Sequence, residues 1–180
     1  VKNKLAPSDL AHADETGINL SGKRHWLHCV SNNDWTLYHP HQKRGFDAMN
    51  DMGILPEFKG TLCHDHWKPY YKIDCTHALC NAHHLRELTR AFEQDGQTWA
   101  QDLGNLLVTI NNKVIDAGGA LDPVNARKYR LKYRKIIKNG EIECPEPVRP
   151  KKKGKRGRIK KSKSRNLLER LRDYENDTLR

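Results

Sequence analysis

Small or apolar residues alternate with polar ones in short stretches over the first 80 positions, a pattern typical of β-strands. A short helix is predicted over residues 44–53, ending at Gly53, and a turn or short helix over residues 67–72. The order of these elements indicates a mixed sheet with helices packed on it, an α/β fold. The predicted strands are residues 9–14, 25–31, 34–40, 60–65 and 76–80.

Further along the chain, apolar residues recur three and four positions apart, the spacing of an amphipathic helix. This pattern is interrupted at Gly96 and continues to the glycine pair at Gly118. Asp122 and Pro123 form an N-cap and first-turn pair for another helix, which we expect to end at Gly140.

These patterns divide the 180 residues into four segments. We expect an α/β core over residues 1–95 and a helical insertion over residues 96–143. A basic linker is predicted over residues 144–165, and residues 166–180 are interpreted as the start of an amphipathic C-terminal helix. A chain of this length holds one domain, with room for a small appendage.

The positive charge of the chain is concentrated in one stretch. The formal net charge is +11, and residues 149–165 contain eleven Lys or Arg and no acid, so the rest of the chain is neutral. A run of this kind binds phosphate backbones or forms a solvated linker, and its composition fits both alternatives.

The five cysteines show no spacing typical of a disulfide framework, and no signal peptide or membrane-spanning segment is visible. These features indicate a reduced, cytoplasmic protein. Cys75, Cys80 and His83 have a spacing close to that of zinc ligands, but no second ligand pair follows at the usual distance. Whether these three residues bind zinc therefore stays open.

Two aspartates are the strongest candidates for chemistry. Asp14 ends the strand predicted over residues 9–14, and Asp65 ends the one predicted over residues 60–65. Carboxylates on neighbouring strands can hold the divalent cations that support phosphoryl transfer. Each aspartate could instead cap the turn that follows its strand. Glu15, the next acid, should point to the opposite face of the sheet from Asp14.

Several strings around these aspartates, in order, resemble the catalytic domain of insertion sequence 66 family transposases. The resemblance runs from about residue 9 to residue 108, more than half of the chain. The strings are HADETG (12–17), GKRHWLHCVS (22–31), TLYHPHQKRG (36–45), MGILPEFKG (52–60), HDHWKPYY (64–71), HALCNAHHLRELT (77–89) and GQTWAQDLGNLLV (96–108).

The resemblance implies a ribonuclease H-like fold and an acidic triad of two aspartates and a glutamate. Asp14 and Asp65 match the two aspartates, as catalytic residues that bind Mg²⁺ or Mn²⁺. The family's glutamate lies in an Asn-Asn-x-Ala-Glu-Arg string that this chain lacks, so we expect the third acid beyond residue 180. Glu87 matches a different family position and is not assigned to the triad. Residues 1–180 alone should then be inactive.

The implied activity is metal-dependent cleavage and strand transfer at transposon ends, with transposon and target DNA as partners. We expect a homodimer or larger assembly and a bacterial, nucleoid-associated location. The alternatives are a nuclease of the same fold that does not transpose, a non-catalytic nucleic-acid-binding module, and a degenerate gene remnant. The residues predicted to bind DNA are Lys151, Lys152, Lys153, Lys155, Arg156, Arg158, Lys160 and Lys161.

Overall fold

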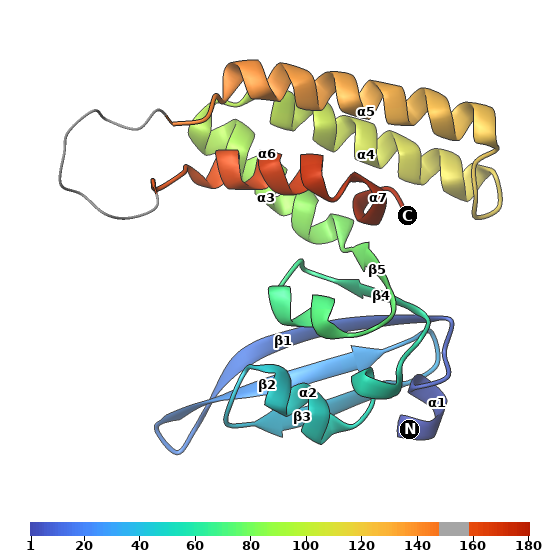
Figure 1. Ribbon diagram of the computed structural model, residues 1–180, viewed down its shortest axis with the longest axis vertical. Coiled ribbons are helices and arrows are strands. Elements are labelled where there is room, and N and C mark those ends of the chain that lie inside the picture. Colours follow the sequence, from blue (N-terminus) through green and yellow to red (C-terminus); the bar gives the residue numbers. More distant parts are fainter. Residues whose placement is uncertain (148–158) are drawn as a thin grey trace. The chain divides into compact units, whose positions relative to one another are not determined.

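The computed structural model describes residues 1–147 and 159–180, which form two compact units (Figure 1). The first unit is built mainly from residues 1–80 and the second mainly from residues 81–175. The sequence pattern placed the boundary of the core later, after residue 95. The structure assigns the intervening helix to the second unit because this helix packs against the other helices there.

The first unit is built on a five-stranded mixed sheet with the strand order β3-β2-β1-β4-β5. β1, β2 and β3 form an antiparallel meander, while β4 is parallel to β1 and β5 is parallel to β4. The predicted mixed α/β sheet with flanking helices is confirmed. The strands are β1 (Leu10–Leu20), β2 (Lys23–Ser31), β3 (Thr36–His41), β4 (Thr61–His64) and β5 (Thr76–Leu79).

The hairpin between β1 and β2 is longer than the sequence pattern indicated. Pairing continues to Leu20 opposite Lys23, so the expectation that the first strand ends at Asp14 was wrong. Ser21 and Gly22 make the connection with φ angles of 51° and 78°. Two consecutive positive φ angles are typical of the tight turns whose twist matches that of paired strands. Asp14 therefore lies within an extended strand rather than at its end.

Short helical segments flank this sheet. The helix predicted over residues 44–53 is confirmed, and it ends at Gly53, whose φ of 68° is the left-handed conformation typical of a helix end. The segments are α1 (Lys2–Leu5), α2 (Phe46–Met52) and the 3₁₀ helices η1 (Leu55–Glu57) and η2 (Lys68–Lys72). The apolar core of this unit includes Leu5, Ala11, Ala13, Val30, Met49, Met52, Ile54, Leu55, Phe58, Leu62, Tyr70 and Ile73.

Gly60 allows β4 to begin directly against the start of β1. A Cβ atom at this position would lie 2.3 Å from the carbonyl oxygen of Ser8 and 2.6 Å from that of Asp9, closer than real side chains approach backbone. The next residue, Thr61, donates its N–H to the Asp9 carbonyl at 2.7 Å. The missing side chain therefore helps to set how β4 aligns with β1.

The second unit is helical. Its long helices bury one apolar cluster that includes Trp99, Leu103, Tyr133 and Leu168. Gly96 has a φ of 66° and separates α3 from α4, as the sequence indicated. The helices are α3 (Asn81–Asp95), α4 (Thr98–Asp116), α5 (Pro123–Glu143), α6 (Lys163–Asp173) and α7 (Glu175–Thr178), the last of which also contributes residues to the first unit.

Two predicted helix boundaries were wrong. α5 does not end at Gly140 but continues to Glu143, with Gly140 buried inside it. The C-terminal helix begins at Lys163, within the predicted basic linker, where the Ser162 side chain accepts the N–H of Arg165 as an N-cap. It then breaks at Tyr174 instead of running through residues 166–180. Among the described residues, no helix is long and apolar enough to cross a membrane.

Candidate metal-ion site

Asp14 and Asp65 follow matched positions on two adjacent parallel strands. The last paired residues of β1 and β4 are His12 and Cys63, and each aspartate comes two residues later. Neighbouring strands lie about 4.8 Å apart, and this register places the two aspartates at equivalent positions just beyond the paired segment of β1 and β4. Both aspartates also raise the pKa of Tyr70, after the larger effects of burial and of Glu15. Both carboxylates therefore lie near enough to Tyr70 to affect its ionisation.

Both carboxylates have an oxygen atom left that could coordinate a cation. The Asp14 Oδ1 atom accepts the N–H of Glu15 at 2.9 Å, and the Asp65 Oδ1 atom accepts the N–H of Trp67 at 2.8 Å. The Asp65 contact is the local turn contact expected of a capping aspartate, whereas Asp14 lies within β1 and bonds only to the adjacent backbone N–H among the described residues. Among the described residues, no hydrogen bond or ion pair occupies either Oδ2 atom. Capping and metal binding are therefore compatible here, and oxygen donors of this kind suit Mg²⁺ or Mn²⁺.

Glu15 points away from Asp14, as strand alternation predicted, and its side chain is fully buried. Arg44 donates to its Oε1 atom through Nε at 2.8 Å and through Nη2 at 2.5 Å, and the Tyr70 hydroxyl donates to Oε2. The Arg44 guanidinium also lies over the rings of Trp26 and Trp67, 4.9 Å and 4.3 Å from their centres. Glu15 thus ties β1 to the segment that follows Asp65.

The pKa of Glu15 is raised by burial, although the hydrogen bonds from Tyr70 and Arg44 partly oppose that rise. The contacts of Arg44 and Tyr70 with Glu15 were not predicted from the sequence. The alternation of side chains along β1 could have indicated that Glu15 has a buried partner. Ala11, Ala13 and Glu15 lie on the same face of β1, and the two alanines are buried there. An acid on a buried face of a strand needs a partner that compensates its charge.

His64, beside Asp65, is buried and uncharged at neutral pH. Burial is the main reason that its pKa falls to about 4, with the nearby His77 as a second cause. Its Nδ1 atom accepts the N–H of His66 at 3.2 Å, which leaves Nε2 to donate to the Nδ1 atom of His77 at 3.1 Å. These bonds give His64 a structural role in holding the turn around Asp65.

The possible zinc ligands do not form a site. Within residues 1–147 and 159–180, no group of three or more His, Cys, Asp or Glu side chains is placed to hold a metal ion. Cys80 instead makes a side-chain hydrogen bond with Cys63, which raises the pKa of the Cys63 thiol. The structure therefore does not bring Cys75, Cys80 and His83 together as a zinc site.

The model of the family described as "Transposase IS66 family" matches the whole chain, residues 1–180. The chain belongs to this transposase family. The match confirms the family that the motif strings indicated and extends it over the helical unit. In this IS66 family chain, Asp14 and Glu15 lie in the first of those strings, and Asp65, Trp67 and Tyr70 lie in a later one.

A solved structure similar to this transposase family chain is the simian T-cell lymphotropic virus intasome in complex with PP2A regulatory subunit B56 gamma. The two chains are 10% identical, and the similarity covers 82% of this chain with a TM-score of 0.35. It covers 52% of the other chain, so this chain spans about half the length of that structure's chain. No curated protein is significantly similar to the chain.

Most of the DNA-binding residues predicted for this family member lie outside the described residues. These are Lys151, Lys152, Lys153, Lys155, Arg156 and Arg158. Of the two that are described, Lys160 is exposed, whereas Lys161 forms ion pairs with Glu169 at 2.5 Å and Glu146 at 3.3 Å. The charge of Lys161 is therefore already balanced within the second unit.

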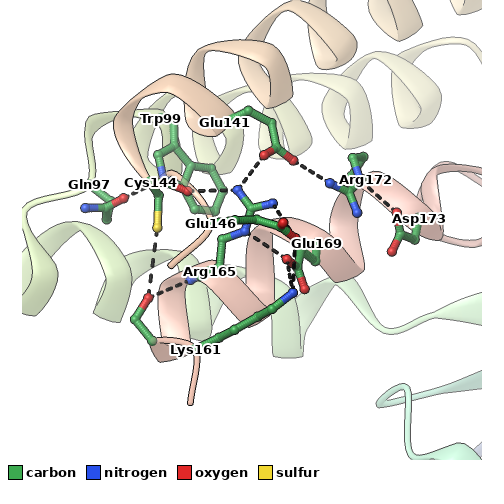
Figure 2. A network of polar contacts seen from close by, with 11 residues as sticks. Gln97, Trp99, Glu141, Cys144, Glu146, Lys161, Arg165, Glu169, Arg172 and Asp173 are labelled. Atoms are coloured by element: carbon green, nitrogen blue, oxygen red, sulfur yellow. Dashed lines mark hydrogen bonds and ion pairs between the residues drawn. The ribbon is translucent and has the colours of Figure 1, made fainter. Parts of the chain in front are cut away.

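Lys161 belongs to a wider ionic network centred on Arg165, which is almost fully buried (Figure 2). Arg165 binds Glu141, donates to the Cys144 carbonyl at 2.8 Å and binds Glu169 at 2.9 Å. A buried guanidinium requires such partners because an unpaired charge in the interior is very costly. The end of the basic run is therefore a structural element of the helical unit. The Glu169 side chain is also mostly buried there.

Proposed function

We propose that this chain is the catalytic segment of a transposase that cleaves DNA at transposon ends and joins it to target DNA. The observation that supports this most directly is the register of β1 and β4, which aligns Asp14 with Asp65 in an IS66 family chain. The strand order, with an antiparallel meander followed by two parallel strands, is compatible with the ribonuclease H-like fold implied by the family resemblance.

In this proposal, Asp14 and Asp65 hold Mg²⁺ or Mn²⁺ through their carboxylate oxygens. The bound metal would stabilise charge on the attacking and leaving oxygens of the phosphoryl transfer. Glu15 has a different role, because Arg44 and Tyr70 already occupy its oxygens. It keeps β1 and the segment after Asp65 in place. The third acid, a glutamate, is expected outside residues 1–180.

Several partner assignments belong to the same proposal. DNA is the expected substrate, and Lys151, Lys152, Lys153, Lys155, Arg156, Arg158 and Lys160 are the expected phosphate contacts. Binding through such cations should weaken steeply as the salt concentration rises. A dimer or larger assembly remains a prediction, based on the need to bring two transposon ends together.

The test is nicking of supercoiled DNA that carries a transposon end, by the protein with its third acid present and with Mg²⁺ or Mn²⁺. We expect Asp14→Asn and Asp65→Asn each to reduce the rate at least about 100-fold, because each removes a charged metal ligand. Asp34→Asn is the matched control. It neutralises an exposed aspartate in the β2–β3 connection and should leave the rate unchanged.

Unchanged nicking by either site variant would overturn the assignment of that aspartate. Nicking without joining of the freed 3′ end to a second DNA would instead favour the non-transposing nuclease. DNA binding that is independent of metal, with no nicking by the unmutated protein, would favour the non-catalytic binding module.

A further inference from the structure

α5 carries a second concentration of positive charge, separate from the basic run at residues 149–165. From Pro123 to Gly140 this helix contains seven Lys or Arg and no acid. Six of the seven side chains belong to exposed residues, namely Arg127, Lys128, Lys132, Arg134, Lys135 and Lys138.

The opposite side of α5 holds the helix in the unit. Tyr133, Ile137 and Gly140 are buried, and the Tyr133 hydroxyl donates to the Leu171 carbonyl at 2.7 Å. Because this apolar side supplies the packing, the exposed lysines are not needed for folding. They can be replaced by glutamine, which has a similar helix propensity, without disturbing the core.

Three acids on or packed against α5 are already engaged by internal partners. Glu141 pairs with Arg165 and Arg172, and Glu143 accepts the backbone N–H groups at the start of α4. Glu175 pairs with Arg130 and Arg134.

In the part of the chain that the structure describes, no acid forms an ion pair with Lys128, Lys132, Lys135 or Lys138. We call these four lysines the α5 cationic face. Its positive charge is directed outward without compensation.

We propose that the α5 cationic face binds the phosphate backbone of duplex DNA. α5 has 21 residues and is therefore about 30 Å long, close to the roughly 34 Å of one turn of the double helix. Flexible lysine side chains suit phosphate contacts that position the protein without reading the sequence. The inference rests on DNA as the proposed partner but not on the metal chemistry.

An anionic lipid surface is a less suitable partner for this face. Helices that lie on membranes insert a continuous apolar stripe. The exposed apolar residues of α5 are Val124, Leu131 and Ile142, which lie about two or more turns apart, and the main apolar side is buried in the unit. The outward face is therefore charged without being amphipathic in the way that membrane insertion requires.

The experiment measures binding of a short fluorescent duplex to the full chain by anisotropy, over a series of NaCl concentrations and with EDTA present. The test variant is Lys128→Gln with Lys135→Gln. The matched control is Lys59→Gln with Lys113→Gln, which removes the same charge from exposed lysines that are paired with Asp74 and Asp116.

If both lysines contact phosphates, the slope of log K against log salt should decrease in magnitude by about 2, since each phosphate contact contributes about 0.9. Affinity at low salt should fall several-fold and equally for two unrelated duplex sequences. The control should keep the unmutated slope. Because EDTA removes divalent metal ions, this binding measurement does not depend on metal bound by Asp14 and Asp65. A failure of DNA binding by α5 can therefore be distinguished from a failure of metal-dependent nicking.

An unchanged slope in the α5 variant would overturn the proposal, as would an equal loss in the control, since the effect would then be one of net charge. Binding to vesicles of anionic phospholipid is measured in parallel. Vesicle binding that depends on Lys128 and Lys135, together with DNA binding that does not, would assign the face to a membrane and likewise overturn the proposal.

Discussion

Among the single residues, Glu15 shows how a buried charge can support a neighbouring site. We expect Glu15→Ala to lower the free energy of unfolding by about 3 kcal/mol, because it leaves the Tyr70 hydroxyl and part of the Arg44 guanidinium without a partner. Glu15→Gln should fall between the alanine variant and the unmutated protein, since it keeps the shape and loses the charge. Urea unfolding at neutral pH measures all three.

The control for this prediction is the adjacent residue. Asp14 is exposed, and among the described residues its side chain bonds only to the next backbone N–H, so Asp14→Ala should change the free energy of unfolding by less than about 0.5 kcal/mol. Equal destabilisation by Asp14→Ala and Glu15→Ala would contradict the structural role given to Glu15.

The sequence allowed the two candidate ligands to be predicted but not their support. Asp14 and Asp65 follow small or apolar residues in short strands, a local pattern. The bonds from Arg44 and Tyr70 to Glu15 join residues 29 and 55 positions apart, and no local pattern encodes such a pairing. The alternation of side chains did predict that Glu15 and Asp14 face opposite sides of the sheet.

Among the secondary-structure elements, α5 shows why a glycine was misinterpreted as a helix end. Glycine is unfavourable inside a helix by about 1 kcal/mol relative to alanine, so Gly140 favours an end when the sequence is considered alone. In the structure, a Cβ atom on Gly140 would lie 2.7 Å from Leu168 Cδ1 and 3.0 Å from Trp99 Cγ. The glycine is there because α5 packs closely against these two side chains, a contact that depends on the tertiary structure.

This packing predicts opposite effects for two glycine-to-alanine substitutions. Gly140→Ala should destabilise the protein by about 1–2 kcal/mol, because the cost of overpacking exceeds the gain in helix propensity. Gly104→Ala, in α4, should stabilise it by about 0.5–1 kcal/mol, since its Cβ atom would meet only Leu85 at an ordinary 3.9 Å. Thermal and urea unfolding measure both. Stabilisation by Gly140→Ala would contradict the close contact.

In the molecule as a whole, some positive charges form internal ion pairs and others face outward, and the composition alone does not distinguish the two. The net charge of +11 was attributed to residues 149–165, yet Arg165 and Lys161 at the end of that run are bound by acids inside the helical unit. In contrast, α5 has exposed lysines, although the segment outside residues 149–165 contains equal numbers of basic and acidic residues. The net charge was counted correctly from the sequence. Which of these charges face outward without a partner depends on the acids that the fold places beside them.

The internal charges make the helical unit sensitive to acid. Although its partial burial opposes the change, the hydrogen bonds from Lys161 and Arg165 lower the pKa of Glu169 to about 2. A carboxyl whose pKa is lower in the folded than in the unfolded chain stabilises the fold above the unfolded pKa of about 4.5. This contribution is lost as the pH falls from about 4.5 towards 2.

We therefore expect Glu169→Gln to be less stable than the unmutated protein at pH 6, and most of the difference to be lost by about pH 2, where Glu169 is about half protonated in the folded protein. Urea unfolding followed by circular dichroism of the helices measures this difference at each pH. Glu93→Gln, at an exposed acid on α3, is the control and should differ little from the unmutated protein throughout. A stability difference for Glu169→Gln that stays constant from pH 6 to pH 2 would show that its ion pairs with Lys161 and Arg165 do not stabilise the unit.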